Sequence, residues 1–244
     1  MELSEKAMFQ VSTLQALSLG YTKKVVTVGE LLTHGDVGLG TFEDVNGEMI
    51  VLDGHCYQAG FDGSIAEADQ SVGVPFAVVT GCTAERSFSL DGIKDIDSLR
   101  TVLDLKIEED FGLNSMHIVR IDGAFEKARA RSESPLRSQH IELKEILSGR
   151  QKDFEFDSIR GTIVALYFPD YMDGINAAGW HFHFLSEDRT KGGHVFDLSI
   201  RSGTVSFDKV SRIELQFPKE AAFDTYDMKK SSAADIKAIE QGGK

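Results

Sequence analysis

The sequence is poor in cysteine. Its 244 residues include only Cys56 and Cys82, whose separation matches no metal-binding or redox motif. We expect both thiols to be reduced and mostly packed, which is the usual state in cytosolic proteins. The scarcity of cysteine therefore excludes a metal or redox site made from cysteine pairs.

Positive charge is also scarce. Lysine and arginine total 26 against 39 aspartate and glutamate residues, which gives a formal net charge of −13 and an isoelectric point near 5.0. Such an acidic protein is poorly suited to bind nucleic acid or an anionic membrane surface. A small anionic substrate would need local positive charge, so for such a substrate we expect a metal cation or an arginine at the site.

Long apolar runs are absent as well. No run approaches the roughly 20 residues that a membrane-spanning helix needs. Residues 1–6 have neither the basic nor the apolar region of a signal peptide, so we expect a cytoplasmic protein. A chain of 244 residues with 41% hydrophobic and 27% charged content can bury a core as one large domain or two lobes.

The N-terminal half is rich in strand and turn signals. Asn46-Gly47 predicts a type I′ turn and hence a β-hairpin, and Asp53-Gly54 predicts a second reversal of the chain. Residues 75–80 are typical of a strand. Apolar residues at helical spacing predict a helix over residues 95–109.

Further along, residues 115–121 predict a strand, and Asp122-Gly123 predicts a turn into a partner strand over residues 124–131. A shorter helix is expected over residues 141–147. The chain beyond the polar stretch at residues 149–152 consists mainly of predicted strands.

These elements predict an α+β fold. We expect a β-rich N-terminal lobe with helices over residues 1–150 and a C-terminal sheet lobe with the functional site over residues 151–244. The polar boundary is too short for a free linker, so a single compact unit is also possible.

Three of the seven histidines fall within fourteen residues, as His181, His183 and His194. Side chains alternate between the two faces of a strand, so His181 and His183 should lie on one face and the neighbouring phenylalanines on the other. The polar loop over residues 186–193 ends in paired glycines and suits a hairpin.

A regular hairpin centred between Asp188 and Arg189 would place His183 opposite His194, and His181 opposite Phe196. Directly opposed Cβ atoms lie about 4.5–5.5 Å apart. The three imidazoles would then be able to share a cation at about 2.0–2.1 Å per nitrogen.

Other interpretations of these histidines exist. A lone strand histidine is usually hydrogen-bonded filler, and a His-x-His pair alone carries a false-positive risk. The third histidine favours a metal, and because no cysteine lies nearby to close the site, it resembles an open catalytic centre. Another mononuclear metal enzyme, such as a hydrolase or oxygenase, is an alternative. A ligand-binding protein with a structural metal is a second one.

Several separated segments resemble the α-acetolactate decarboxylase family, and they occur in the expected order. The residues from Ile175 to Phe184 and from Gly192 to Val195 resemble the zinc motif of the family, including both histidine intervals. The resemblance runs from about residue 9 to residue 201, and the tail matches only loosely. The other matching segments are Gly38 to Phe42, Asn46 to Glu48, Leu52 to Gly54, Tyr57-Gln58, Pro75 to Thr80 and Gly161 to Val164.

The resemblance implies decarboxylation of acetolactate (2-hydroxy-2-methyl-3-oxobutanoate) to acetoin and carbon dioxide, at a zinc ion held by His181, His183 and His194. It also implies a sheet-rich, two-lobed mixed α/β architecture with the metal site on a hairpin of the C-terminal lobe. A small keto acid is the implied substrate, and a homodimer is the implied assembly.

Four further residues match site residues of the family. Glu48 matches a glutamate beside the metal, Thr41 a threonine of the same pocket, and Arg131 the site arginine. Glu240 is the counterpart of a glutamate in the C-terminal segment of the family. This match rests on distance along the chain rather than on a shared motif.

The arginine match departs from the family pattern. The family continues after its arginine with a glutamine and a Pro-Tyr pair, whereas Arg131 leads into residues 132–136, Ser-Glu-Ser-Pro-Leu. Arg129 and Arg137 are therefore rival candidates for the same role.

The implied chemistry suits these residue types. Loss of carbon dioxide from a β-keto acid leaves an enediolate, whose negative charge a divalent cation stabilises. A guanidinium can orient the departing carboxylate. Either Glu48 or Glu240 would then supply a proton to one face of the enediolate, and the sequence leaves that choice open.

Overall fold

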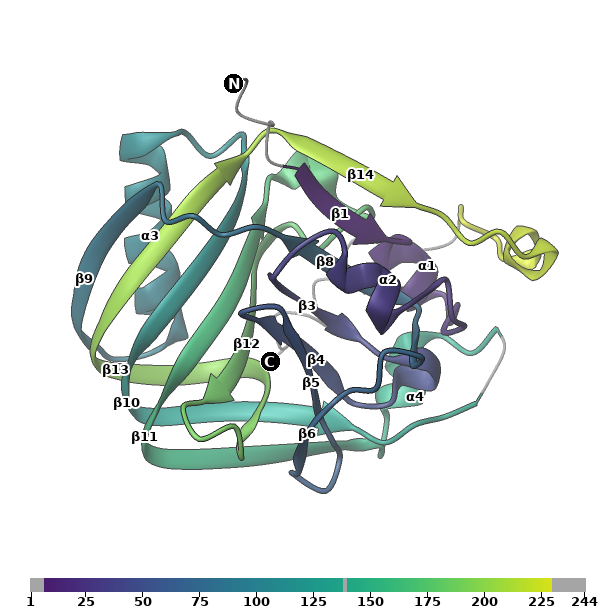
Figure 1. The fold of residues 1–244 in the computed structure, drawn as a ribbon, viewed down its shortest axis with the longest axis horizontal. Coiled ribbons are helices and arrows are strands. Elements are labelled where there is room, and N and C mark those ends of the chain that lie inside the picture. Colours follow the sequence, from purple (N-terminus) through teal and green to yellow (C-terminus); the bar gives the residue numbers. More distant parts are fainter. Residues whose placement is uncertain (1–6, 138–139, 230–244) are drawn as a thin grey trace.

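The computed structural model describes residues 7–137 and 140–229, which form two large β-sheets and a short two-stranded one (Figure 1). The N-terminal sheet has seven strands in the order β14-β1-β8-β3-β4-β5-β6. These strands are β1 (Ala7–Val11), β3 (Val37–Thr41), β4 (Glu48–Leu52), β5 (His55–Ala59), β6 (Ile65–Glu67), β8 (Phe76–Thr80) and β14 (Arg212–Gln216). The short sheet pairs β2 (Val26–Thr27) with β7 (Gly73–Val74).

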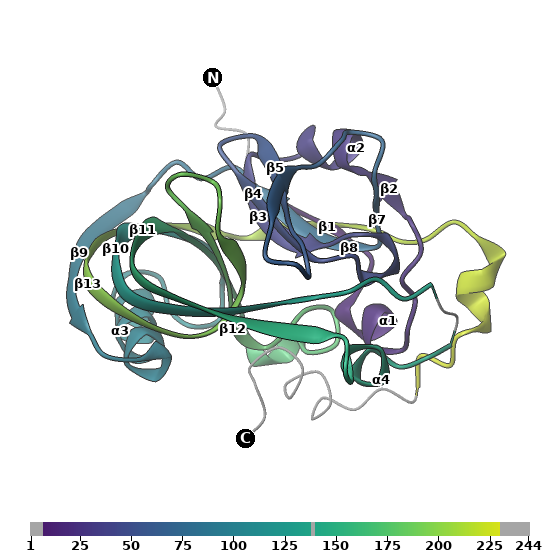
Figure 2. The same ribbon diagram turned by 90° about the horizontal axis from the view of Figure 1, so that it is seen from below.

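The second large sheet closes on itself. It contains β9 (Arg86–Ile93), β10 (Met116–Glu133), β11 (Gln151–Phe168), β12 (Gly179–Ser186) and β13 (Gly192–Val210). Both β10 and β12 pair with β11 and with β13, so these four strands form a closed ring, called here the strand ring. Strand β9 adds to β13. Figure 2 shows the ring beside the N-terminal sheet.

Four α-helices accompany the sheets in the described ranges: α1 (Leu14–Ser18), α2 (Val28–Leu32), α3 (Ile96–Asp110) and α4 (Leu143–Leu147). Helix α3 confirms the prediction over residues 95–109, and the Asp95 side chain caps it by accepting a hydrogen bond from the Ser98 amide at 2.7 Å. Short 3₁₀ turns occur at η1 (Glu43–Val45), η2 (Asp170–Met172) and η3 (Ala221–Thr225). No helix in this part of the chain is both long and apolar enough to cross a membrane.

The two predicted turns flanking β4 differ. Asp53 and Gly54 both have positive φ angles, 55° and 80°, as in a type I′ turn, and they join β4 to β5 directly, which confirms the predicted reversal. The predicted two-residue turn at Asn46-Gly47 is wrong, because Asn46 has a φ of −86° and the η1 segment lengthens the connection. Strands β3 and β4 nevertheless pair as an antiparallel hairpin.

The predicted turn at Asp122-Gly123 is also wrong. These residues lie inside the continuous 18-residue strand β10. Gly123 pairs with Gly161 on one side and Gly203 on the other, and a Cβ on Gly123 would lie 2.7 Å from the Ser202 carbonyl oxygen. The glycine therefore permits close approach of neighbouring strands rather than a reversal.

Each side of the strand ring packs against a different partner. On β12, Phe182 and Phe184 belong to a core that includes Leu99 and Leu103 of α3. Leu185 belongs instead to the core shared with the N-terminal sheet. The predicted alternation along this strand is confirmed, and His181 and His183 share the side that faces the N-terminal sheet.

The structure confirms a sheet-rich α+β fold, but the two sheets do not divide at residue 150. That position falls between β10 and β11, which are adjacent strands of the ring. The N-terminal sheet takes its strands from residues 7–80 and from β14, which pairs with β1 after the chain has left the ring. The candidate site lies where the two sheets face each other.

Candidate metal centre

The hairpin β12–β13 brings the three histidines together. His183 pairs with His194, as predicted. The further pairing of His181 with Phe196 is wrong, because β12 and β13 pair only from His183 and His194 toward the loop. Beyond His194, β13 pairs with β10, and His181 lies opposite Leu166 of β11 instead.

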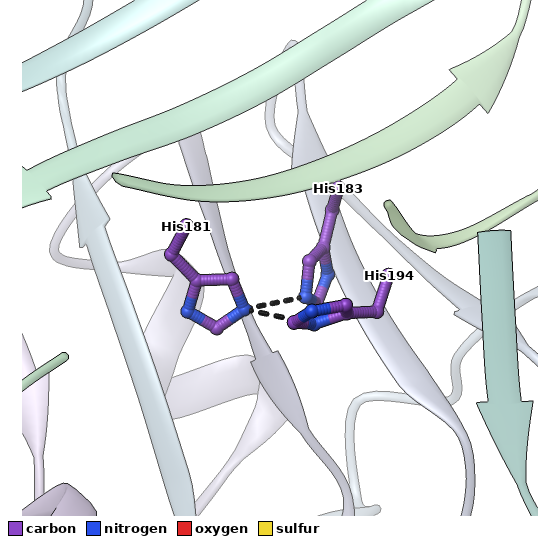
Figure 3. A group of neighbouring side chains, drawn as sticks. All are labelled: His181, His183 and His194. Atoms are coloured by element: carbon purple, nitrogen blue, oxygen red, sulfur yellow. Dashed lines mark hydrogen bonds between the residues drawn. The ribbon is translucent and has the colours of Figure 1, made fainter. Parts of the chain in front are cut away.

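The three ring nitrogens converge on one point between the sheets (Figure 3). His181 Nε2 lies 3.0 Å from His183 Nε2 and 3.1 Å from His194 Nδ1. Nitrogens bound tetrahedrally at about 2.0–2.1 Å from one zinc ion would be about 3.3 Å apart. The observed spacing therefore fits a shared cation after a small outward adjustment.

Burial keeps His181 and His183 neutral. The residues His181, His183 and His194 are 5%, 0% and 3% exposed. Burial, together with the Arg131 charge, lowers the pKa of His181 to about 3, and burial also holds the pKa of His183 well below its usual range. A neutral imidazole is the form that binds a metal.

A backbone contact orients His183. Its Nδ1 donates to the carbonyl oxygen of Met49 on β4 at 2.8 Å, which directs Nε2 toward the other two rings. The N-terminal sheet thus sets the orientation of a side chain from the strand ring.

Glu48, which precedes Met49 at the start of β4, also lies near the histidines. This side chain is buried, and its Oε2 lies 3.4 Å from His183 Nε2 while its Oε1 lies 3.9 Å from His194 Nδ1. Thr41 pairs with Glu48 across β3 and β4 and donates to the Gly47 carbonyl oxygen at 2.8 Å. The structure therefore places both residues beside the histidines.

Of the three arginine candidates, Arg131 lies at the site. It pairs with His194 across β10 and β13, and its Nη2 is 3.3 Å from His194 Nε2. Arg129 contacts Glu155, Asp197 and the ring of Phe196 instead. Arg137 does not line the cavity formed by the described residues, and Glu240 falls outside them.

Comparison with known proteins agrees with this architecture. The family model described as alpha-acetolactate decarboxylase matches residues 8–230. An alpha-acetolactate decarboxylase from Methanosarcina mazei is 35% identical over 234 residues, which cover 96% of this chain and 80% of the relative. One from Lactococcus lactis is 38% identical over 212 residues, covering 86% of this chain and 87% of the relative. The crystal structure of alpha-acetolactate decarboxylase from Bacillus subtilis superposes with a TM-score of 0.91 at 30% identity, covering 96% of this chain and 99% of that one.

The chain belongs to the alpha-acetolactate decarboxylase family.

The cavity of this family member has a polar part and an apolar part. Beside the polar group of Thr41, Glu48, Arg131, His181 and His194 it has an apolar wall. That wall consists of Leu17 of α1, Val45 of η1, Phe76 of β8 and Leu143 and Leu147 of α4. Such a division suits a small molecule with charged and alkyl ends.

Sequence reasoning missed two polar residues of the cavity, Glu133 and Gln151. They pair across β10 and β11 at the ends of both strands. Glu133 follows Arg131 by two positions. Extending the predicted strand beyond residue 131 would therefore have placed the side chains of Arg131 and Glu133 on one face. The polar run at residues 132–134 concealed that continuation.

Proposed function

We propose that this protein decarboxylates 2-acetolactate to acetoin and carbon dioxide with a zinc ion bound by His181, His183 and His194. The observation that carries the proposal is the convergence of three buried histidine nitrogens beside a cavity that His181 and His194 line together with Arg131 and Glu48. Family membership supports the same substrate. We further propose a cytoplasmic homodimer.

The reaction needs an electron sink and a proton. When carbon dioxide leaves a 2-hydroxy-3-oxo acid, the bonding electron pair moves into the adjacent ketone and leaves an enediolate. The bound divalent cation supplies Lewis acidity at this centre. Imidazole binds a metal in its uncharged form, so three histidine ligands would leave the positive charge of the cation undiminished.

Arg131 orients the substrate. Its guanidinium is next to His194 and can hold the carboxylate that departs, with the breaking bond directed toward the electron sink. The contribution is orientation rather than tight pairing, because the carboxylate loses its charge in the transition state.

Glu48 is our candidate for the proton donor. Its carboxyl group lies close to two of the histidine nitrogens that face the centre, and so within reach of a substrate bound there. Protonation from one side would give one enantiomer of acetoin. Thr41, beside Glu48, lines the pocket and helps to define its shape.

A hydrolase using the same centre is the competing function, because a carboxylate such as Glu48 next to a metal can activate water. Incubation of the purified protein with racemic acetolactate distinguishes the decarboxylase from the hydrolase. We expect optically active acetoin, zinc at about one ion per chain by elemental analysis, and loss of activity with retention of the fold after chelation. Acetoin no higher than the spontaneous background would exclude the proposed function.

A further inference from the structure

Glu133 is a buried carboxylate in the cavity to which the proposed chemistry gives no role. Glu133 is 4% exposed and lines the cavity together with Arg131, His181 and His194. Burial of a carboxylate is costly unless a cation or hydrogen-bond donors compensate the charge. The location of such a group beside a substrate cavity therefore calls for a function.

Arg131 is the cation suited to compensate it. Among the described residues that line the cavity, Arg131 is the only lysine or arginine. The two residues are separated by one position on β10, so their side chains leave the strand on the same side. Across β10 and β13, Arg131 is opposite His194, and its Nη2 lies 3.3 Å from His194 Nε2, so the guanidinium is beside the candidate metal centre.

An uncompensated guanidinium would hinder this reaction. Decarboxylation removes the negative charge of the substrate carboxylate, so a strong ion pair in the ground state is lost in the transition state. Binding energy of that kind lowers KM and lowers kcat with it. A nearby carboxylate weakens the pull of the guanidinium while leaving its hydrogen-bond geometry in place.

We propose that Glu133 acts through Arg131 as a positioning residue, its negative charge partly neutralising the guanidinium on the cavity wall that both residues line. The inference rests on the proposed function for its substrate class, a 2-hydroxy-3-oxo carboxylate. Glu133 thereby lets Arg131 orient the carboxylate without binding it tightly.

The test compares an anionic and a neutral probe. 2-Hydroxy-2-methylpropanoate carries the carboxylate and tertiary hydroxyl of the substrate but has no ketone, and 2,3-butanediol has no charge. By calorimetry on the zinc-loaded protein, Glu133→Gln should bind the anionic probe about fivefold more tightly, equivalent to about 1 kcal/mol. Affinity for the diol should stay within about twofold. With acetolactate, KM and kcat should both fall.

Two further variants serve as controls. Glu155→Gln removes the same charge from β11, where Glu155 pairs with Lys127 and Arg129 outside the cavity, and it should leave both probes unaffected. In an Arg131→Met background, Glu133→Gln should change affinity for the anionic probe by less than about twofold. Thermal melts establish that each variant is folded.

Three results would overturn the inference. The first is an unchanged affinity for the anionic probe, or no binding of it to either protein. The second is an equal change for both probes, which indicates altered shape rather than charge. The third is equal tightening with and without Arg131, which indicates that Glu133 repels the substrate directly. Failure of the proposed function appears separately, as absence of acetoin from the wild-type protein.

Discussion

The strand ring has buried histidines on both of its sides. On the side facing the N-terminal sheet, His181, His183 and His194 direct ring nitrogens toward one point. On the side that α3 covers, His117 is fully buried between the aromatic rings of Phe111 and Tyr167.

Burial alone does not distinguish the two sides. It lowers the pKa of His117 to about 4 and that of His181 to about 3, so both rings are neutral at physiological pH. The difference lies in the neighbours: other donor atoms surround His181, whereas aromatic side chains surround His117. Convergence of donors, rather than burial, therefore marks a candidate metal ligand.

The largest effect is expected from removal of one of the three converging histidines. His183→Ala removes one of three nitrogens and also the contact with Met49, so zinc binding should be lost and acetoin formation should fall to background. Elemental analysis and an acetoin assay check this. His55→Ala, which removes an exposed histidine paired with Glu67, is the matched control. Full zinc content in His183→Ala would contradict the assignment.

Glu48→Gln should have the next largest effect. It preserves the size of the side chain but cannot donate a proton as a carboxyl group does, so kcat should fall by about a hundredfold. Zinc content and thermal stability should change little. Steady-state kinetics at saturating acetolactate measure kcat. A kcat within about threefold of the wild-type value would show that Glu48 takes no part in the catalytic step.

On the α3 side, substitutions should change stability rather than chemistry. Phe184 is fully buried against Phe125 and Phe156, so Phe184→Ala should lower the free energy of unfolding by about 3–5 kcal/mol. Denaturant unfolding measures the loss. The folded fraction should retain the kcat of the wild type, and a selective loss of kcat without destabilisation would contradict the division between the two sides.

His117 should affect stability only in acid. Its folded-state pKa of about 4 lies below the unfolded value near 6.5, so the folded protein binds fewer protons between these values. Stability is therefore unaffected above pH 6.5 and is lost as pH falls toward 4, by up to about 3 kcal/mol. His117→Phe should flatten this part of the pH profile of unfolding, and an unaltered profile would show that other groups control it.

Local patterns predicted much of the candidate site. Alternation along residues 180–185 identified the shared face of His181 and His183, and the loop length predicted the register that pairs His183 with His194. Helix α3 followed from its apolar spacing. These features depend on residues close together in the sequence.

The remaining features depend on contacts between distant segments. Gly123 resembled a turn residue locally, but pairing with Gly161 and Gly203 makes it part of a continuous strand. Closure of the ring likewise required β10 to pair with two strands at once. Glu133 was missed because the polar run at residues 132–134 hid the continuation of the predicted strand, whereas β10 extends to Glu133 and buries it at the cavity.

The most direct test of the account is anomalous diffraction at the zinc edge from crystals soaked with 2,3-butanediol. We predict one peak about 2.0–2.1 Å from the nearest nitrogens of His181, His183 and His194, with a diol oxygen completing the coordination and another within hydrogen-bonding reach of Glu48. The absence of a peak between the three rings, or a diol bound elsewhere, would contradict the assignment of this site.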